Sequence, residues 1–120
     1  MFYPLFQNAS PGNYSPVLMF DGANGVGAAK MADFLPYLGD SLQVKVFNIG
    51  TEAGDVLNKD CGADYVKVEK KASRGLEGTR GERCISVDGD ADRIMYFYND
   101  DQGVFHMLDG DKIATLGRFF

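Results

Sequence analysis

Residues 17–20 (Val-Leu-Met-Phe) place the strongest constraint on the fold, because they form an unbroken apolar run that ends at Asp21-Gly22. A run of this kind is typical of a strand that is buried on both faces of a sheet. The glycine-rich turn after it leads into residues 28–35, where we expect a helix that ends before Pro36. This order of a buried strand and a helix predicts an α/β domain.

Apolar runs and turn residues predict further elements along the rest of the chain. Additional strands are expected at residues 43–48, 65–68, 84–87, 94–98 and 104–107. A short helix is expected within residues 51–60, and a last helix follows Asp109, which is a suitable N-cap. Residues 72–83 carry glycines among charged residues and predict a mobile loop. Together these elements predict a single three-layer α/β domain with a mixed, mainly parallel sheet flanked by helices.

The length of 120 residues allows one hydrophobic core and therefore one domain. Residues 1–16 carry several prolines and polar side chains, which predicts a linker or lead-in and leaves residues 17–120 as the domain. The chain ends at Phe119-Phe120, in or just after the last expected helix. This exposed apolar ending suggests a fragment of a larger protein.

Charge and composition argue against several classes of protein. The net charge of −5 is opposite to that of a nucleic-acid binder, and no stretch approaches the length of a membrane span. Cys61 and Cys84 are too few for a disulfide framework, and the first residues lack the features of a signal peptide. We therefore expect a reduced, cytoplasmic protein that binds neither nucleic acid nor membranes.

The segment Asp88-Gly89-Asp90-Ala91-Asp92-Arg93 is the most informative motif. Its three carboxylates would be spread over about 13 Å of an extended strand, and they converge only if the chain curls. Converging carboxylates repel one another, and a divalent cation that prefers oxygen ligands, such as Mg²⁺, Ca²⁺ or Mn²⁺, relieves the repulsion. The alternative is an acidic, solvated turn in which Arg93 pairs with a neighbour. The spacing alone leaves both interpretations open.

Two other features are less specific. Residues 21–27 form a glycine-rich turn without the spacing of a dinucleotide-binding motif or a P-loop. A tight structural turn is the favoured interpretation, with a phosphate site or an interdomain contact as alternatives. His106, the only histidine, lies in an expected strand, where a structural role is favoured over general base chemistry.

Five segments carry a family resemblance when they are taken in order. They are Asp-Gly-Ala-Asn-Gly-Val-Gly-Ala (21–28), Cys-Gly-Ala-Asp-Tyr-Val-Lys (61–67), Arg-Cys with Ser86 (83–86), the acidic loop (88–93) and Leu-Asp-Gly-Asp-Lys-Ile-Ala-Thr-Leu (108–116). The chain resembles eukaryotic phosphoacetylglucosamine mutases, which belong to the α-D-phosphohexomutase superfamily. The acidic loop alone marks the superfamily, whereas the second and fifth segments make the narrower assignment.

The resemblance implies a four-domain enzyme that interconverts N-acetylglucosamine 6-phosphate and 1-phosphate on the route to UDP-N-acetylglucosamine. It implies that this chain is the second domain, that Asp88, Asp90 and Asp92 bind Mg²⁺, and that Arg93 lies beside the transferring phosphoryl group. The phosphoserine, sugar-binding and phosphate-binding loops of the family have no counterpart here. We therefore expect the chain alone to be inactive and to meet its hexosamine phosphate substrate only together with the missing domains. The alternatives are a phosphoglucosamine or phosphomannose mutase, or a non-catalytic module that binds divalent cations.

Overall fold

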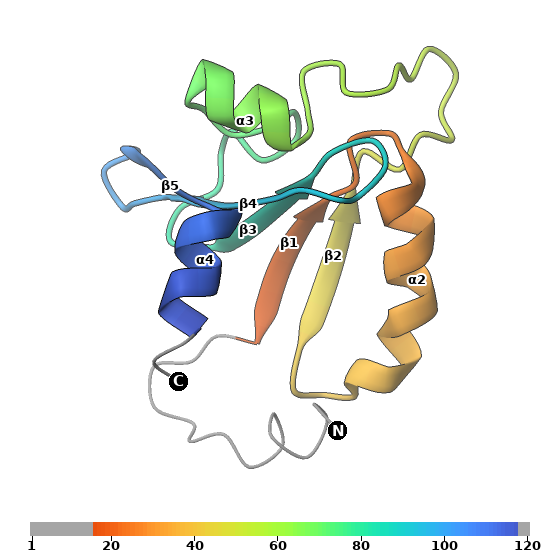
Figure 1. Cartoon of the computed structure of the whole chain (residues 1–120), viewed down its shortest axis with the longest axis horizontal. Helices are drawn as coiled ribbons and strands as arrows, with labels where there is room; N and C mark the ends of the chain where they lie inside the picture. Colours follow the sequence, from red (N-terminus) through yellow and green to blue (C-terminus); the bar gives the residue numbers. More distant parts are fainter. Residues whose placement is uncertain (1–15, 118–120) are drawn as a thin grey trace.

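The structure, a computed structural model, describes residues 16–117 and consists of a twisted sheet with helices around it (Figure 1). The predicted lead-in, apart from Pro16, and the terminal Phe119-Phe120 lie outside the described residues. Within residues 16–117, no helix combines the length and the apolar character needed to cross a membrane.

The sheet has five strands in the spatial order β2-β1-β3-β4-β5. The strands are β1 (Val17–Asp21), β2 (Gln43–Phe47), β3 (Arg83–Val87), β4 (Ile94–Asn99) and β5 (Phe105–Asp109). β1 pairs in parallel with β2 and β3, whereas β4 runs antiparallel to β3 and β5. Four strands therefore point in one direction and β4 in the other, which confirms the predicted mixed sheet.

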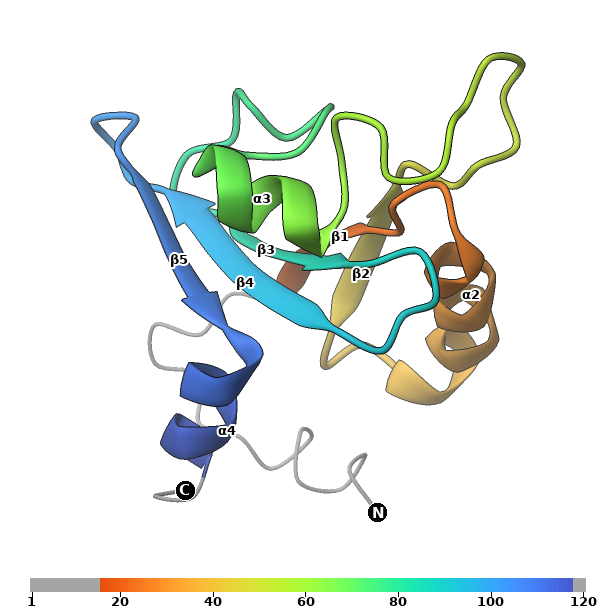
Figure 2. The same ribbon diagram turned by 45° about the horizontal axis from the view of Figure 1, so that its top comes forward.

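Two helices cover opposite faces of this sheet and make the domain three-layered. The helix α3 (Ala63–Glu69) lies across β3 and β4 (Figure 2). The core beneath it is formed by Met19, Ala63, Val66, Ala72, Leu76, Cys84, Met95 and Phe97. On the other face, Phe20 and Val87 approach Gly27 of the helix α2 (Val26–Leu38). Successive side chains of β1 are thus buried on opposite faces of the sheet, as its apolar run predicts.

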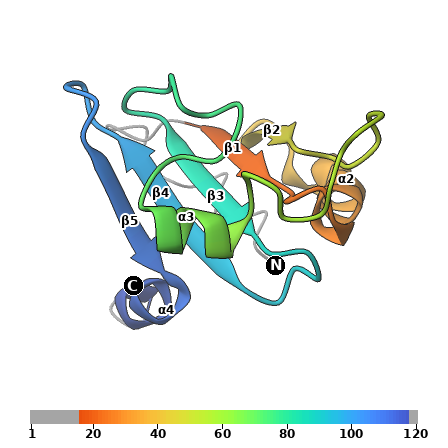
Figure 3. The same ribbon diagram turned by 90° about the horizontal axis from the view of Figure 1, so that it is seen from above.

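The end of the described chain also follows the prediction. A turn connects β4 to β5, and the helix α4 (Gly110–Gly117) begins where β5 ends (Figure 3). The Asp109 carboxylate accepts a hydrogen bond from the N–H of Lys112 at 3.0 Å, which confirms Asp109 as the N-cap of this helix.

The strand predicted at residues 65–68 is wrong, because these residues belong to α3. The alternation of Val66 and Val68 suggests a strand, but Val66 is fully buried whereas Val68 is 73% exposed. Ala63 and Val66, which are three residues apart, form the buried face instead. Helical spacing therefore describes this segment better than the two-residue period of a strand.

Two helix predictions also need correction. No helix forms within residues 51–60. This segment is a series of turns, and its residues Gly54, Asn58 and Asp60 have positive φ angles, which an α-helix does not allow. Pro36 does not end the preceding helix but lies inside α2, which continues to Leu38. The proline is exposed near the last turn, where it removes one backbone hydrogen bond without disturbing the sheet.

Asp21, the last residue of β1, is fully buried and connects four segments at the carboxyl end of the parallel strands. Its Oδ1 accepts hydrogen bonds from the Ala23 N–H and the Asn48 amide, both at 2.9 Å. Its Oδ2 accepts from the Gly62 N–H at 2.7 Å and from the Ser86 hydroxyl. These donors satisfy the buried carboxylate and hold the first turn, the segment after β2, the start of α3 and β3 against one another.

Replacing Asp21 with Asn is expected to lower the free energy of unfolding of the 120-residue chain by about 2–3 kcal/mol, because an amide group would face donors that require an acceptor. Urea denaturation followed by circular dichroism measures this change. The control Ser86→Ala removes only one neutral donor and should cost about 1 kcal/mol. An Asp21→Asn chain as stable as the original would contradict this account of the contact.

Candidate metal site

The acidic loop of residues 88–93 connects β3 to β4 and is curled by hydrogen bonds to Asp88. The Asp88 Oδ1 atom accepts from the N–H groups of Asp92 and Arg93, at 3.0 and 3.1 Å. The Asp88 carbonyl accepts from the Ala91 N–H at 2.9 Å, and Ala91 has a φ of 60°. The loop therefore wraps around the first carboxylate, which is the curl that convergence of the three side chains requires.

The structure brings Asp88, Asp90 and Asp92 together. One carboxylate oxygen from each lies within 4.8 Å of the others, with Asp88 buried and the other two exposed. Mg²⁺ holds oxygen ligands at about 2.1 Å in an octahedron, so neighbouring ligands lie about 3.0 Å apart and opposite ligands about 4.2 Å apart. The two exposed side chains would rotate towards the cation to reach these separations. The all-oxygen donor set and its spacing thus fit a hard divalent cation.

The carboxyl groups of the cluster also shift one another's pKa values. Burial acts to raise the pKa of Asp88, but hydrogen bonds from the Arg93 N–H and the neighbouring carboxyl groups outweigh it and hold this pKa below its ordinary value. Hydrogen bonds with Asp90 and Asp88 raise the pKa of Asp92. Asp88 therefore favours its charged form, and Asp92 retains a proton more readily than Asp88 does.

The glycine-rich turn supports the acidic loop through close backbone contact. The N–H of Val26, the first residue of α2, donates to the Gly89 carbonyl at 3.1 Å. A Cβ atom on Gly25 would lie 2.3 Å from that same carbonyl oxygen, and a Cβ on Gly89 would lie 2.9 Å from Leu57 Cδ1. Gly25 is required because a side chain there would overlap the backbone of Gly89, whereas the exposed Leu57 side chain opposite Gly89 can move. This close contact supports the interpretation of residues 21–27 as a structural turn.

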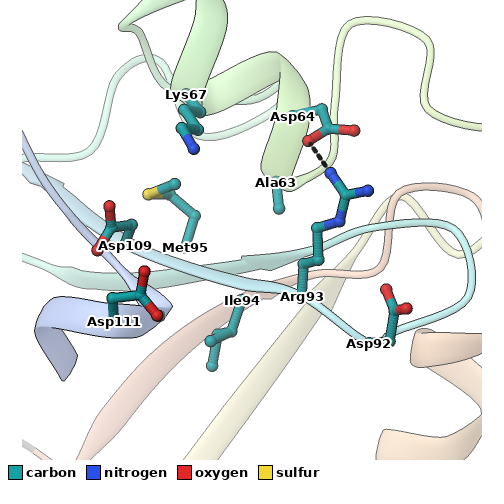
Figure 4. A pocket seen from close by; sticks show the side chains of 10 residues that line it. Ala63, Asp64, Lys67, Asp92, Arg93, Ile94, Met95, Asp109 and Asp111 are labelled. Atoms are coloured by element: carbon teal, nitrogen blue, oxygen red, sulfur yellow. Dashed lines mark hydrogen bonds and ion pairs between the residues drawn. The ribbon is translucent and has the colours of Figure 1, made fainter. Parts of the chain in front are cut away.

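Arg93 lies beside the cluster and has two acidic neighbours. Its Nη1 contacts Asp64 Oδ1 at 3.0 Å, and its Nε faces Asp88 Oδ2 at 3.6 Å. Arg93, Asp64 and Asp92 border a pocket of about 290 Å³ between α3, β4 and the start of α4 (Figure 4). Asp64 is absent from the predicted site, and it directly precedes the strand expected at residues 65–68. Its place in the first turn of a helix that begins after Gly62 is the signal that would identify it.

The remaining reactive side chains lie elsewhere. Burial and the nearby Asp21 carboxylate raise the pKa of the Cys61 thiol to about 12, and burial raises that of Cys84 to about 11. Both thiols are free and buried, which describes inert core cysteines. His106 pairs with Asp100 at 3.0 Å in the β4–β5 hairpin, at the other end of β4 from the acidic loop. These contacts fit the structural role predicted for the histidine.

The sequence comparisons point to one family. The family described as "Phosphoacetylglucosamine mutase AMG1, domain II" matches residues 6–95. The phosphoacetylglucosamine mutase of Sus scrofa is 49% identical over 116 residues, which are 96% of this chain and 21% of the pig protein. The Homo sapiens enzyme is 50% identical over 99 residues, which are 82% of this chain and 18% of the human protein. The chain thus spans about one fifth of the length of these relatives.

Solved structures agree with the sequence relatives. Aspergillus fumigatus N-acetylphosphoglucosamine mutase in complex with GlcNAc-6P and magnesium has a TM-score of 0.78 and 41% identity, covering 95% of this chain and 23% of that chain. An N-acetylglucosamine-phosphate mutase of the α-D-phosphohexomutase superfamily, in its product complex, has a TM-score of 0.85 and 34% identity, covering 98% and 22%. The family match, the relatives and the fold lead to one conclusion: the chain belongs to the phosphoacetylglucosamine mutase family and corresponds to its domain II.

Proposed function

We propose that this chain supplies the Mg²⁺ site of an enzyme that interconverts N-acetylglucosamine 6-phosphate and N-acetylglucosamine 1-phosphate. Asp88, Asp90 and Asp92 are the proposed ligands. The observation that carries the proposal is the convergence of three carboxylate oxygens within 4.8 Å, in a domain of this family. The A. fumigatus relative, whose structure contains GlcNAc-6P and magnesium, supports both the cation and the class of substrate.

The side chains around the cluster suit phosphoryl transfer, which depends mainly on positioning and on neutralising charge at the phosphoryl oxygens. A bound Mg²⁺ supplies part of that neutralisation. Arg93 is proposed to donate hydrogen bonds from its guanidinium to the phosphoryl oxygens, and its contact with Asp88 keeps it beside the cluster. Asp88 provides the fixed negative charge that anchors the cation.

The complete reaction needs parts that this chain does not supply. We propose that residues 17–120 form the metal-binding domain of a larger cytoplasmic enzyme, whose other domains supply the phosphoserine and the groups that bind the hexosamine phosphate. The coverage of about one fifth of each relative supports this division of roles. A non-catalytic cation-binding module and another phosphohexomutase are the alternatives. Assays of the full-length protein with the corresponding sugar phosphates distinguish them.

Asp90→Asn in the full-length protein is expected to lower Mg²⁺-dependent turnover of N-acetylglucosamine 6-phosphate at least about tenfold, because the site loses one of its charged ligands. Asp33→Asn, which removes an exposed charge from α2, is the matched control and should leave turnover unchanged. Coupled-enzyme kinetics over a series of Mg²⁺ concentrations measure both variants. Wild-type activity and metal dependence in Asp90→Asn would show that the ligand assignment is wrong.

Mg²⁺ binding is expected to weaken as the pH falls, because the cation must displace a proton from the cluster. The pKa of Asp92 lies above its ordinary value, so the cluster retains a proton to a higher pH than an isolated aspartate does. Mg²⁺ should therefore release protons at a pH where the cluster is still partly protonated. Isothermal titration calorimetry of the chain, in two buffers with different ionisation enthalpies, measures the release. Equal proton release by the Asp92→Asn variant would contradict the role of this carboxyl group.

Stability of the cation-free chain should follow the same titration. A pKa that folding raises contributes stability at low pH, and this contribution is lost as the pH rises through the folded-state pKa. The contribution of Asp92 is therefore present in acid and lost towards neutral pH, where repulsion among the carboxylates remains. Thermal unfolding should accordingly show a larger stabilisation by Mg²⁺ at neutral pH than in acid.

Arg93→Lys is expected to lower kcat of the full-length enzyme about tenfold although it keeps the positive charge, because an ammonium group cannot make the two-pronged contact of a guanidinium. Steady-state kinetics with saturating Mg²⁺ measure the change. Unchanged kinetics would support the simpler interpretation, in which Arg93 only balances the charge of its acidic neighbours.

A further inference from the structure

Asp64 and Arg93 come from different parts of the chain and meet beside the acidic loop. Asp64 lies in the first turn of α3, and its Oδ1 accepts a hydrogen bond from Arg93 Nη1 at 3.0 Å (Figure 4). We propose that Asp64 is a positioning residue, which holds the Arg93 guanidinium in the orientation that receives a phosphoryl group. This inference rests on the function proposed for Arg93 and adds a residue to it.

The position of Asp64 is fixed by buried contacts on both sides. The N–H of Gly62, two residues earlier, donates to the buried Asp21 carboxylate at 2.7 Å. Val66, two residues later, is fully buried in the core. The backbone of Asp64 is therefore tied to the same carboxylate that organises the strand ends. A carboxylate on such a rigid element can orient another side chain, whereas one on a mobile loop cannot.

The guanidinium is held on two of its sides and leaves the third available. Asp64 contacts Nη1, and Asp88 faces Nε at 3.6 Å. Among residues 16–117, no described residue makes a hydrogen bond with Nη2. A guanidinium has five N–H donors in one plane, so the hydrogen bond from Nη1 and the longer ion pair at Nε favour one orientation of the remaining donors. Those donors are suited to the oxygens of a phosphoryl group.

The ion pair itself has little importance for stability. The side chains of Arg93 and Asp64 are 65% and 63% exposed, and exposed pairs contribute little to folding. Asp64 also suits the first turn of a helix because its charge opposes the positive end of the helix dipole. A purely local role of that kind predicts no link between Asp64 and Arg93 in catalysis. The two explanations therefore differ in a measurable way.

The test is a double-mutant cycle in the full-length enzyme, with N-acetylglucosamine 6-phosphate as substrate and Mg²⁺ at saturation. Asp64→Asn is expected to lower kcat about tenfold, with KM, the Mg²⁺ dependence and the unfolding temperature unchanged. Asp64→Glu should recover part of the loss, because it restores the carboxylate. In the Arg93→Lys background, Asp64→Asn should cause no further loss. Glu69→Gln removes one exposed charge from the same helix without contacting Arg93, and it should behave as wild type.

The outcomes separate this inference from the proposed function. If Arg93→Lys lowers kcat and Asp64→Asn does not, the positioning role is wrong and the role of Arg93 stands. If the two substitutions have fully additive effects, or if Asp64→Asn acts by lowering the unfolding temperature, Asp64 works independently of Arg93 and the inference is overturned. If Arg93→Lys has no effect, the proposed role of Arg93 fails, and the inference fails with it.

Discussion

The Asp21 carboxylate is the contact on which the rest of the described structure depends. It is fully buried at the end of the central strand and accepts hydrogen bonds from the turn after β1, the segment after β2, the residue before α3 and the side chain of Ser86 in β3. A buried charge is costly unless its hydrogen bonds are satisfied. Each of these segments is therefore required to remain in register with the others.

The candidate metal site begins two residues beyond one of these contacts. Ser86 is bound to Asp21, Val87 ends β3, and Asp88 then starts the acidic loop. The same carboxylate ties the N–H of Gly62 and so fixes the start of α3, which carries Asp64. One buried group thus sets the relative positions of the loop and of the helix that contacts Arg93. The rigid sheet edge explains how exposed side chains are presented in a defined arrangement.

The acidic loop has a local energetic cost, because three converging carboxylates repel one another. Their mutual hydrogen bonding raises the pKa of Asp92, which is the signature of like charges held close together. Conflicts of this kind between local energetics and the observed structure are expected at functional sites. The surrounding backbone contacts, above all the close approach of Gly25 to Gly89, keep the loop in place.

Much of the fold could be predicted from the sequence, because β1, β3 and β4 are apolar runs with clear turns between them. The acidic loop was also recognisable, since its spacing has few uses other than a cation site or a solvated turn. The helix that contains Tyr65 and Val66 could not be predicted from the local sequence pattern. The alternation of apolar and polar residues in this short segment resembles a strand, and only burial in the folded domain distinguishes the helix from it. The role proposed for Asp64 depends on that helix, so spacing along the chain could not identify it.

The central claim is that Asp88, Asp90 and Asp92 form one divalent-cation site. The most direct measurement is an anomalous difference map from crystals soaked with Mn²⁺, recorded at the manganese absorption edge. The account predicts one strong peak at the three carboxylates, and no such peak in crystals of the Asp90→Asn variant. A strong peak elsewhere together with no density at the acidic loop would contradict it.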